Sequence, residues 1–123
     1  MDRLILVVDD EAAFCEVVCE ILAAAGYRAH RALSVEEAYL CLKDEIPDLI
    51  LTDIMMPETD GLTFIRELKE RSPYASIPTV VVSACTTPSD EQNALDAGAL
   101  HVLSKPFSSN DLELVVNSLL KAS

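Results

Sequence analysis

The sequence predicts an α/β fold in which five strand–helix units, (βα)5, form a doubly wound parallel five-stranded sheet. Apolar runs of strand length alternate five times with segments of helical periodicity. Right-handed crossovers between parallel strands place helices on both faces of such a sheet. The chain has 123 residues, the size of one domain with one core. We therefore expect residues 1–123 to form a single domain, a three-layer sandwich with strand order 2-1-3-4-5.

The predicted strands are rich in Val, Ile and Leu, as expected of strands that are buried on both faces. The second run is more polar than the others, so we expect it nearer an edge of the sheet. The strand-like runs are Leu4–Val8, Tyr27–Arg31, Leu49–Thr52, Thr79–Val82 and Leu100–Leu103.

The predicted helices carry start and stop signals. Ser34 and Glu37 have the spacing of a capping box, which opens a helix that runs to about Asp44. Glycine ends helices readily, and proline is favoured in the first turn. The remaining signals are Gly26 after the first helix, Leu62, Ile65 and Leu68 on one face of the third, Thr87-Pro88 and Gly98 around the fourth, and Ser108 or Ser109 before the fifth.

Polar side chains follow four of the predicted strands. Asp9 and Asp10 follow the first strand, Asp53 the third, Ser83 the fourth, and Lys105 the fifth. The carboxyl ends of parallel strands share one edge of a sheet, where ligands bind. Three carboxylates, a hydroxyl and an ammonium should therefore converge there, a set that suits a divalent cation together with a phosphoryl group.

The three acids predict a magnesium site and a phosphoacceptor. Two unit charges about 4 Å apart repel by about 4 kcal/mol at an effective dielectric near 20, so gathering them favours binding of a hard cation such as Mg²⁺. Asp53 is the candidate nucleophile, which forms an aspartyl phosphate, while Lys105 and Ser83 contact the phosphoryl oxygens. Singly, these residues read as an acidic helix cap, a surface lysine and a strand-end hydroxyl. It is much less plausible that all of these simple interpretations hold at once at four separate strand ends.

Composition excludes some functions. The formal net charge is −12, which disfavours direct binding to nucleic acid and to anionic membranes. No apolar stretch approaches the ~18 residues of a membrane span, and the N-terminus has too short an apolar run for a signal peptide. The four cysteines form no C-x-x-C motif and are read as free thiols. We expect a cytoplasmic protein.

These residues carry a family resemblance over essentially the whole chain. The sequence resembles a response-regulator receiver domain of two-component signalling, a family with a flavodoxin-like fold. Any one matching segment is weak, but together they are highly specific. The segments are Val7–Glu11, Leu51–Pro57 with Asp60-Gly61, Val81–Ala84, Ala97–Ala99 and Lys105–Phe107.

The resemblance implies a phosphoacceptor switch and not an enzyme with a separate substrate. Asp53 would take a phosphoryl group from a phosphohistidine of a sensor histidine kinase or histidine phosphotransfer protein. Asp10 and Asp53 would ligate Mg²⁺ directly with the backbone carbonyl of Met55, and Asp9 would act through a bound water.

The resemblance also implies how the signal leaves the site. Lys105 would contact the phosphoryl group, and its bond to Pro106 would be cis. Ser83 would move toward the phosphoryl group and pull the following loop with it. The face formed by the fourth helix, fifth strand and fifth helix would then act on a downstream protein, an attached output domain or, in a phosphorylation-dependent homodimer, a second copy.

One position departs from the family pattern at the switch. Val102 stands where the family usually has Tyr or Phe, so coupling by rotation of a ring is in doubt. His101 lies beside it, and we hypothesise that it modulates this face, against the simpler reading of an exposed loop histidine. Unchanged partner affinity in His101→Ala would contradict the hypothesis.

Two further positions bear on the lifetime of the phosphoryl group. In the family, residues two after the phosphoacceptor and two after the hydroxyl residue influence hydrolysis. Here these are Met55 and Cys85, and neither is suited to orienting an attacking water. We therefore predict slow self-dephosphorylation.

Three other functions fit the sequence less well. A phosphohydrolase of the haloacid-dehalogenase type resembles D-x-D at the nucleophile, but Met55 stands where the second Asp would be. A flavin-binding module would need a phosphate-cradling loop in place of Asp9-Asp10-Glu11. A receiver that never accepts phosphate is a weaker alternative because every catalytic position is filled. The cognate kinase, the signal, the output and the oligomeric state are not specified by the sequence.

Overall fold

The predicted architecture is confirmed by the computed structural model, which describes residues 3–54, 61–84 and 87–120. Five parallel strands form one sheet in the order β2-β1-β3-β4-β5. The strands are β1 (Leu4–Val8), β2 (Arg28–Ala32), β3 (Leu49–Thr52), β4 (Thr79–Ser83) and β5 (His101–Ser104). The helices are α1 (Ala12–Ala24), α2 (Val35–Asp44), α3 (Gly61–Lys69), α4 (Pro88–Ala97) and α5 (Ser109–Leu120), with a short 3₁₀ turn, η1 (Tyr74–Ser76).

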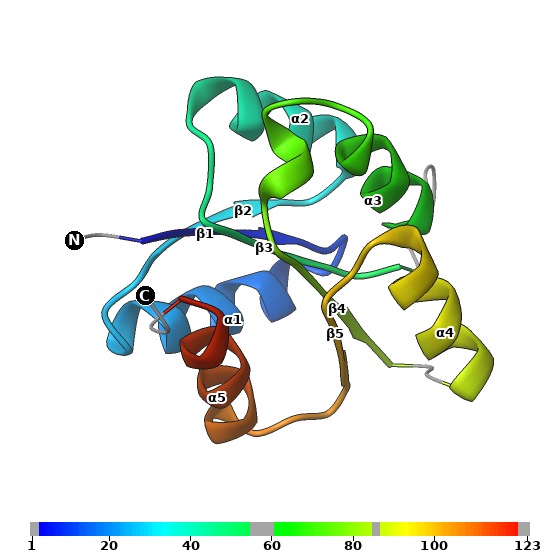
Figure 1. The fold of residues 1–123 in the computed structure, drawn as a ribbon. Helices are drawn as coiled ribbons and strands as arrows, with labels where there is room; N and C mark the ends of the chain where they lie inside the picture. The colour runs from blue at the N-terminus through cyan, green and yellow to red at the C-terminus, as the bar shows by residue number, and fades with distance from the viewer. Residues whose placement is uncertain (1–2, 55–60, 85–86, 121–123) are drawn as a thin grey trace.

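The helices form two outer layers around the sheet. Helices α1 and α5 cover one face, and α2, α3 and α4 cover the other (Figure 1). Alternate residues of β1 serve the two layers: Ile5 and Val7 pack with α1 and α5, whereas Leu6 and Val8 pack with α2 and α3. The central strands are therefore apolar on both faces, as their sequences indicate.

Several predicted helix boundaries are confirmed. Gly26 follows α1 with a φ of 98°, a conformation that glycine adopts without strain. The Ser34 hydroxyl accepts a hydrogen bond from the Glu37 amide at 3.1 Å. Thr87 and Asp90 form a reciprocal capping box at the start of α4. Of the two serines proposed for α5, Ser108 caps it, accepting from the Asp111 amide at 3.0 Å.

Two strands, β2 and β5, begin and end one residue later than predicted, and β4 extends one residue further, to Ser83. Strand β2 begins at Arg28, which pairs with Leu4, because Tyr27 turns into the core and donates a hydrogen bond to Asn117 of α5. Strand β5 begins at His101 because Leu100 is still part of the turn after α4. As expected, β2 lies at an edge.

Candidate functional site

Asp9 and Asp53 lie side by side because their strands pair in register. Val8 is opposite Thr52 in the β1–β3 pair, so the next residue of each strand is an aspartate. The Asp53 amide donates to the Val8 carbonyl at 3.0 Å, which extends the ladder to the site. Both side chains are buried, with exposed fractions of 0% for Asp9 and 6% for Asp53.

The predicted acidic cluster is present. Asp9, Asp10 and Asp53 each place a carboxylate oxygen within 4.8 Å of the others. The Glu11 amide donates to Asp9 Oδ1 at 2.9 Å and fixes the orientation of that carboxylate. Oxygen donors at this density suit a small hard cation, so these residues could hold a metal ion. Met55, the proposed carbonyl ligand, lies outside the described residues.

Lys105 brings a positive charge to the acids. Its Nζ donates to Asp9 Oδ2 at 2.8 Å and to Asp53 Oδ2 at 3.3 Å, and it lies 3.7 Å from Glu11 Oε1. Burial alone would lower the pKa of Lys105, but the hydrogen bonds and charges of Asp9 and Asp53 outweigh it and raise the pKa. The bond between Lys105 and Pro106 is cis. The side chain is therefore a charged group held at the end of β5.

Ser83 ends β4, the neighbour of β3, and its hydroxyl is buried. Ser83 Oγ has no hydrogen-bond partner among the residues that the structure describes. Leaving a buried hydroxyl without a partner costs about 1–3 kcal/mol. The Ser83 hydroxyl could therefore donate a hydrogen bond to a ligand oxygen bound at this edge of the sheet.

Val102, which departs from the family pattern, and its neighbour His101 lie on β5. Val102 is opposite Val81 and half-buried, and it packs against a cluster that includes Ile65 of α3 and Ala94 of α4. His101 is exposed at the start of the strand. Val102 therefore fills the space between β5 and α4 with a side chain that has no ring to rotate.

Two contacts at the site were not anticipated from the sequence. A Cβ on Gly61 would lie 2.1 Å from the Asp53 carbonyl oxygen, although the Asp60-Gly61 pair entered the sequence analysis only as part of the family resemblance. The Phe14 ring centroid lies 4.0 Å from Lys105 Nζ, and no role was predicted for Phe14 from the sequence. The first pair closes one loop, and the second joins α1 to the segment after β5.

The cysteines do not contribute to this site within the described part of the chain. Cys15 is buried, and its thiol donates to the Asp9 carbonyl at 3.4 Å. Burial and the nearby Asp9 charge raise the pKa of Cys15 to about 11. A protonated thiol is a poor metal ligand, so Cys15 acts as a small core residue. Cys85 lies outside the described residues.

The fold and the cluster of acids define a regulatory domain of one family. Residues 5–117 match the response regulator receiver domain. The chain belongs to this family, the receiver domains of two-component response regulators.

Individual relatives agree with this assignment. The chain is 36% identical over 121 residues to the phosphate regulon transcriptional regulatory protein PhoB of Escherichia coli, covering 98% of this chain and 53% of PhoB. It is 35% identical over 117 residues to the response regulator Rre1 of Synechocystis, covering 94% of this chain and 51% of Rre1. The chain thus spans about half the length of these relatives.

Solved structures share the fold closely. The chemotaxis protein CheY4 of Vibrio cholerae matches with a TM-score of 0.92 and 28% identity, covering 98% of this chain and 100% of CheY4. NtrX of Brucella abortus matches with a TM-score of 0.90 and 31% identity, covering 98% of this chain and 27% of NtrX.

Proposed function

We propose that Asp53 accepts a phosphoryl group from a phosphohistidine of a sensor histidine kinase or histidine phosphotransfer protein. A carboxylate oxygen of Asp53 attacks phosphorus, the P–N bond to the donor breaks, and its electron pair returns to the imidazole nitrogen. The observation that carries this proposal is the 3.3 Å contact between Lys105 and Asp53 within a cluster of three carboxylates. Lys105 would donate its hydrogen bond to a phosphoryl oxygen in place of the carboxylate oxygen that it now contacts.

Magnesium is the cofactor that the donor set suits best. Asp10 and Asp53 would hold it directly together with the main-chain carbonyl of Met55, and Asp9 would hold it through water. Bound Mg²⁺ supplies positive charge that offsets the charge of the incoming phosphoryl group. Asp10 is exposed whereas Asp9 and Asp53 are buried, which leaves the cluster open to a cation on one side.

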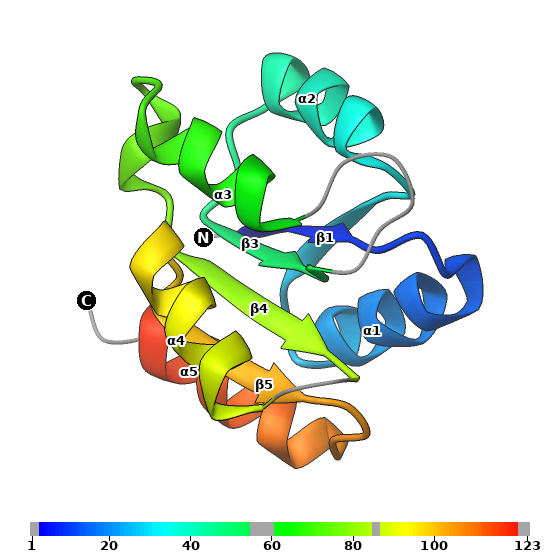
Figure 2. The same ribbon diagram turned by 90° about the vertical axis from the view of Figure 1, so that its right-hand side faces the viewer.

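Ser83 is the proposed trigger of the switch. Its buried hydroxyl, which lacks a partner among the described residues, would donate to a phosphoryl oxygen and draw the segment between β4 and α4 toward the site. Helix α4 packs next to β5 (Figure 2), so this movement would change the α4–β5–α5 face. With Val102 in place of an aromatic ring, the change would be transmitted by shifts of α4, and His101 is exposed where such a face would be read.

The output of the switch is a partner, an attached output domain or a second copy of the chain. PhoB is named as a transcriptional regulator, and a regulatory role of that kind would be exerted through another domain. The net charge of −12 argues against DNA binding by this domain itself. We also propose that the domain is cytoplasmic. Within the described residues, no helix combines the length and apolar character needed to cross a bilayer. Size-exclusion chromatography with and without phosphorylation distinguishes a second copy from other partners.

The function is tested by incubating the protein with Mg²⁺ and a small acyl-phosphate donor and following its intact mass. We expect the gain of one phosphoryl group, blocked by a chelator and absent in Asp53→Asn. The matched control is Asp44→Asn, which removes an exposed acid at the end of α2 and should be phosphorylated like the wild type. Equal phosphorylation of Asp53→Asn and wild type would contradict the assignment of the acceptor.

The lifetime of the phosphoryl group is measured on the same sample after the donor is removed. We expect slow loss, over many minutes or longer, because Met55 and Cys85 have no group suited to orienting a water for attack on phosphorus. Both residues lie outside the described part of the chain, so this prediction comes from their chemistry alone. A lifetime of seconds without a phosphatase would contradict it.

A further inference from the structure

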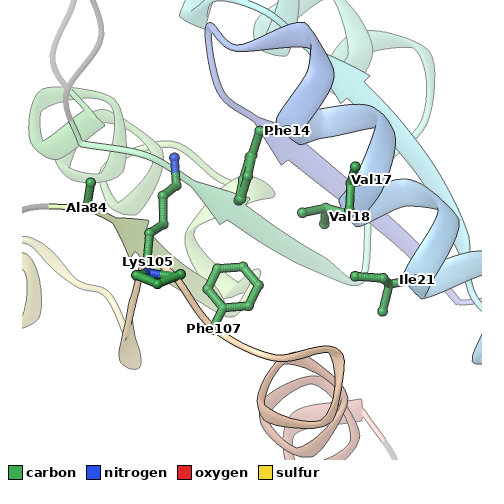
Figure 3. A pocket seen from close by; sticks show the side chains of 8 residues that line it. Phe14, Val17, Val18, Ile21, Ala84, Lys105 and Phe107 are labelled. Carbon is green, nitrogen blue, oxygen red and sulfur yellow. The ribbon is translucent and has the colours of Figure 1, made fainter.

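Phe14 makes a contact with Lys105 that the proposed chemistry has not used. Phe14 lies on α1, one turn after the acidic segment, and its ring lies next to Lys105 in the wall of a cavity of about 460 Å³ that both residues line (Figure 3). The ring centroid is 4.0 Å from Lys105 Nζ. A cation at this distance over an aromatic face is attracted by the negative face of the ring.

The surroundings of the ammonium explain why the ring matters. Lys105 Nζ donates to Asp9 on one side and to Asp53 on another, and its side chain is only 12% exposed. Glu11 Oε1 lies 3.7 Å away and Phe14 covers a further side, so the charge is surrounded by three carboxylates and an aromatic face with little access to water. Such desolvation strengthens an attraction between a cation and a ring.

The ring itself is held in place. Phe107 packs against it edge-to-face, with centroids 5.9 Å apart and an interplanar angle of 85°. Phe107 follows Lys105 by two residues, so the segment that carries the lysine also carries the support of the ring. Figure 3 shows Phe14 between the Lys105 nitrogen and the side chains of Val17 and Val18.

From this geometry we propose that Phe14 is a positioning residue for Lys105, and this inference rests on the proposed phosphoacceptor function. When a cation takes up the carboxylate oxygens that Lys105 contacts, the lysine loses part of what holds it. The Phe14 ring does not compete for that cation and continues to hold the ammonium at the site. Lys105 is then already in place for an oxygen of the phosphoryl group.

The first test is a spectroscopic one that needs no phosphoryl donor. In the wild-type protein with saturating Mg²⁺, the ring current of Phe14 should shift the Lys105 Hε signals upfield, with the signals assigned through Lys105→Met. The shift should persist in Phe14→Tyr, which keeps the ring, and vanish in Phe14→Leu. Lys105 signals that are the same in wild type and Phe14→Leu would overturn the proposal, whatever the fate of the phosphoacceptor assignment.

The second test is the rate of phosphorylation by the small donor. We expect Phe14→Leu to react about three- to tenfold more slowly, the range of a partly desolvated cation–π contact, with Phe14→Tyr close to wild type. Val17→Ala is the matched control, because it alters an exposed residue of the same cavity on the same helix without contacting Lys105. Equal slowing by Phe14→Leu and Phe14→Tyr, or by Val17→Ala, would contradict a role for the ring. Thermal unfolding of each variant separates loss of fold from loss of positioning.

Discussion

Replacing Lys105 with methionine should destabilise the metal-free protein by about 3 kcal/mol, and Mg²⁺ should restore most of that loss. Asp9 is fully buried and accepts a 2.8 Å hydrogen bond from Lys105. Removing one partner of a buried ion pair leaves an uncompensated charge and costs about 3–5 kcal/mol. We expect the lower end because Asp10, in the same cluster, is exposed to solvent.

The restoring effect of Mg²⁺ follows from competition for the same oxygens. In the wild type, Lys105 already neutralises part of the charge of Asp9 and Asp53. Without the lysine, the cluster is more anionic and should bind Mg²⁺ more tightly. A ligand that binds only the folded state stabilises it by an amount that increases with the logarithm of its affinity. The loss of Lys105 should therefore enlarge the stabilisation by Mg²⁺ while slowing phosphorylation, because the charge that meets the phosphoryl group is gone.

Denaturant unfolding with Mg²⁺ and with a chelator measures the loss of stability in Lys105→Met and its recovery by Mg²⁺. Lys43→Met, at an exposed lysine in the last turn of α2, is the control and should change neither stability nor its response to Mg²⁺. Since the pKa of Lys105 is raised above its usual 10.5, the stability it provides is present below that pH and is lost only as pH rises further. The difference in the free energy of unfolding between Lys105→Met and the wild type should thus be constant around neutral pH. Equal Mg²⁺ stabilisation of the two proteins would argue against competition at the cluster.

The fold and the gathering of polar side chains at one edge of the sheet could be predicted because both depend on local signals. An apolar run of four or five residues, followed by helical periodicity, marks a strand–helix unit wherever it stands in the chain. Once the strands are parallel, the residue after each strand is directed to one edge of the sheet. Asp9, Asp53, Ser83 and Lys105 were therefore placed together without knowledge of any distance between them.

The contacts that could not be predicted depend on how closely two segments approach each other in space. The sequence shows Gly61 as a turn glycine, but the reason for a glycine is the Asp53 carbonyl on the other side of the loop. It shows Phe14 as an apolar residue of α1, but the Lys105 contact depends on the angle between α1 and the segment after β5. Similarly, Tyr27 fits a strand by composition, yet its hydrogen bond to Asn117 takes it into the core. Periodicity carries no information about such approaches.

Gly61→Ala should lower the free energy of unfolding by about 2–3 kcal/mol. It should also lower the rate of phosphorylation by about a hundredfold. A Cβ at this position would lie 2.1 Å from the Asp53 carbonyl oxygen and 2.7 Å from Ile54 Cα. Both are backbone atoms that cannot rotate away, so either α3 or the chain at Asp53 must move. Overpacking of this kind typically costs about 1–3 kcal/mol, and displacing a reacting group by about 1 Å can cost about a hundredfold in rate.

Gly26→Ala separates this steric effect from the general cost of replacing a glycine. Gly26 has a φ of 98° and no atom within 4 Å of its Cβ position, so alanine there should cost about 1–2 kcal/mol of backbone strain and leave phosphorylation unchanged. Gly61 begins a helix, where alanine would otherwise be favourable by about 1 kcal/mol. A loss of stability and activity in Gly61→Ala must therefore come from the overlap with Asp53. If Gly61→Ala were phosphorylated at the wild-type rate, the close approach of α3 to the acceptor would not be what holds Asp53 in place.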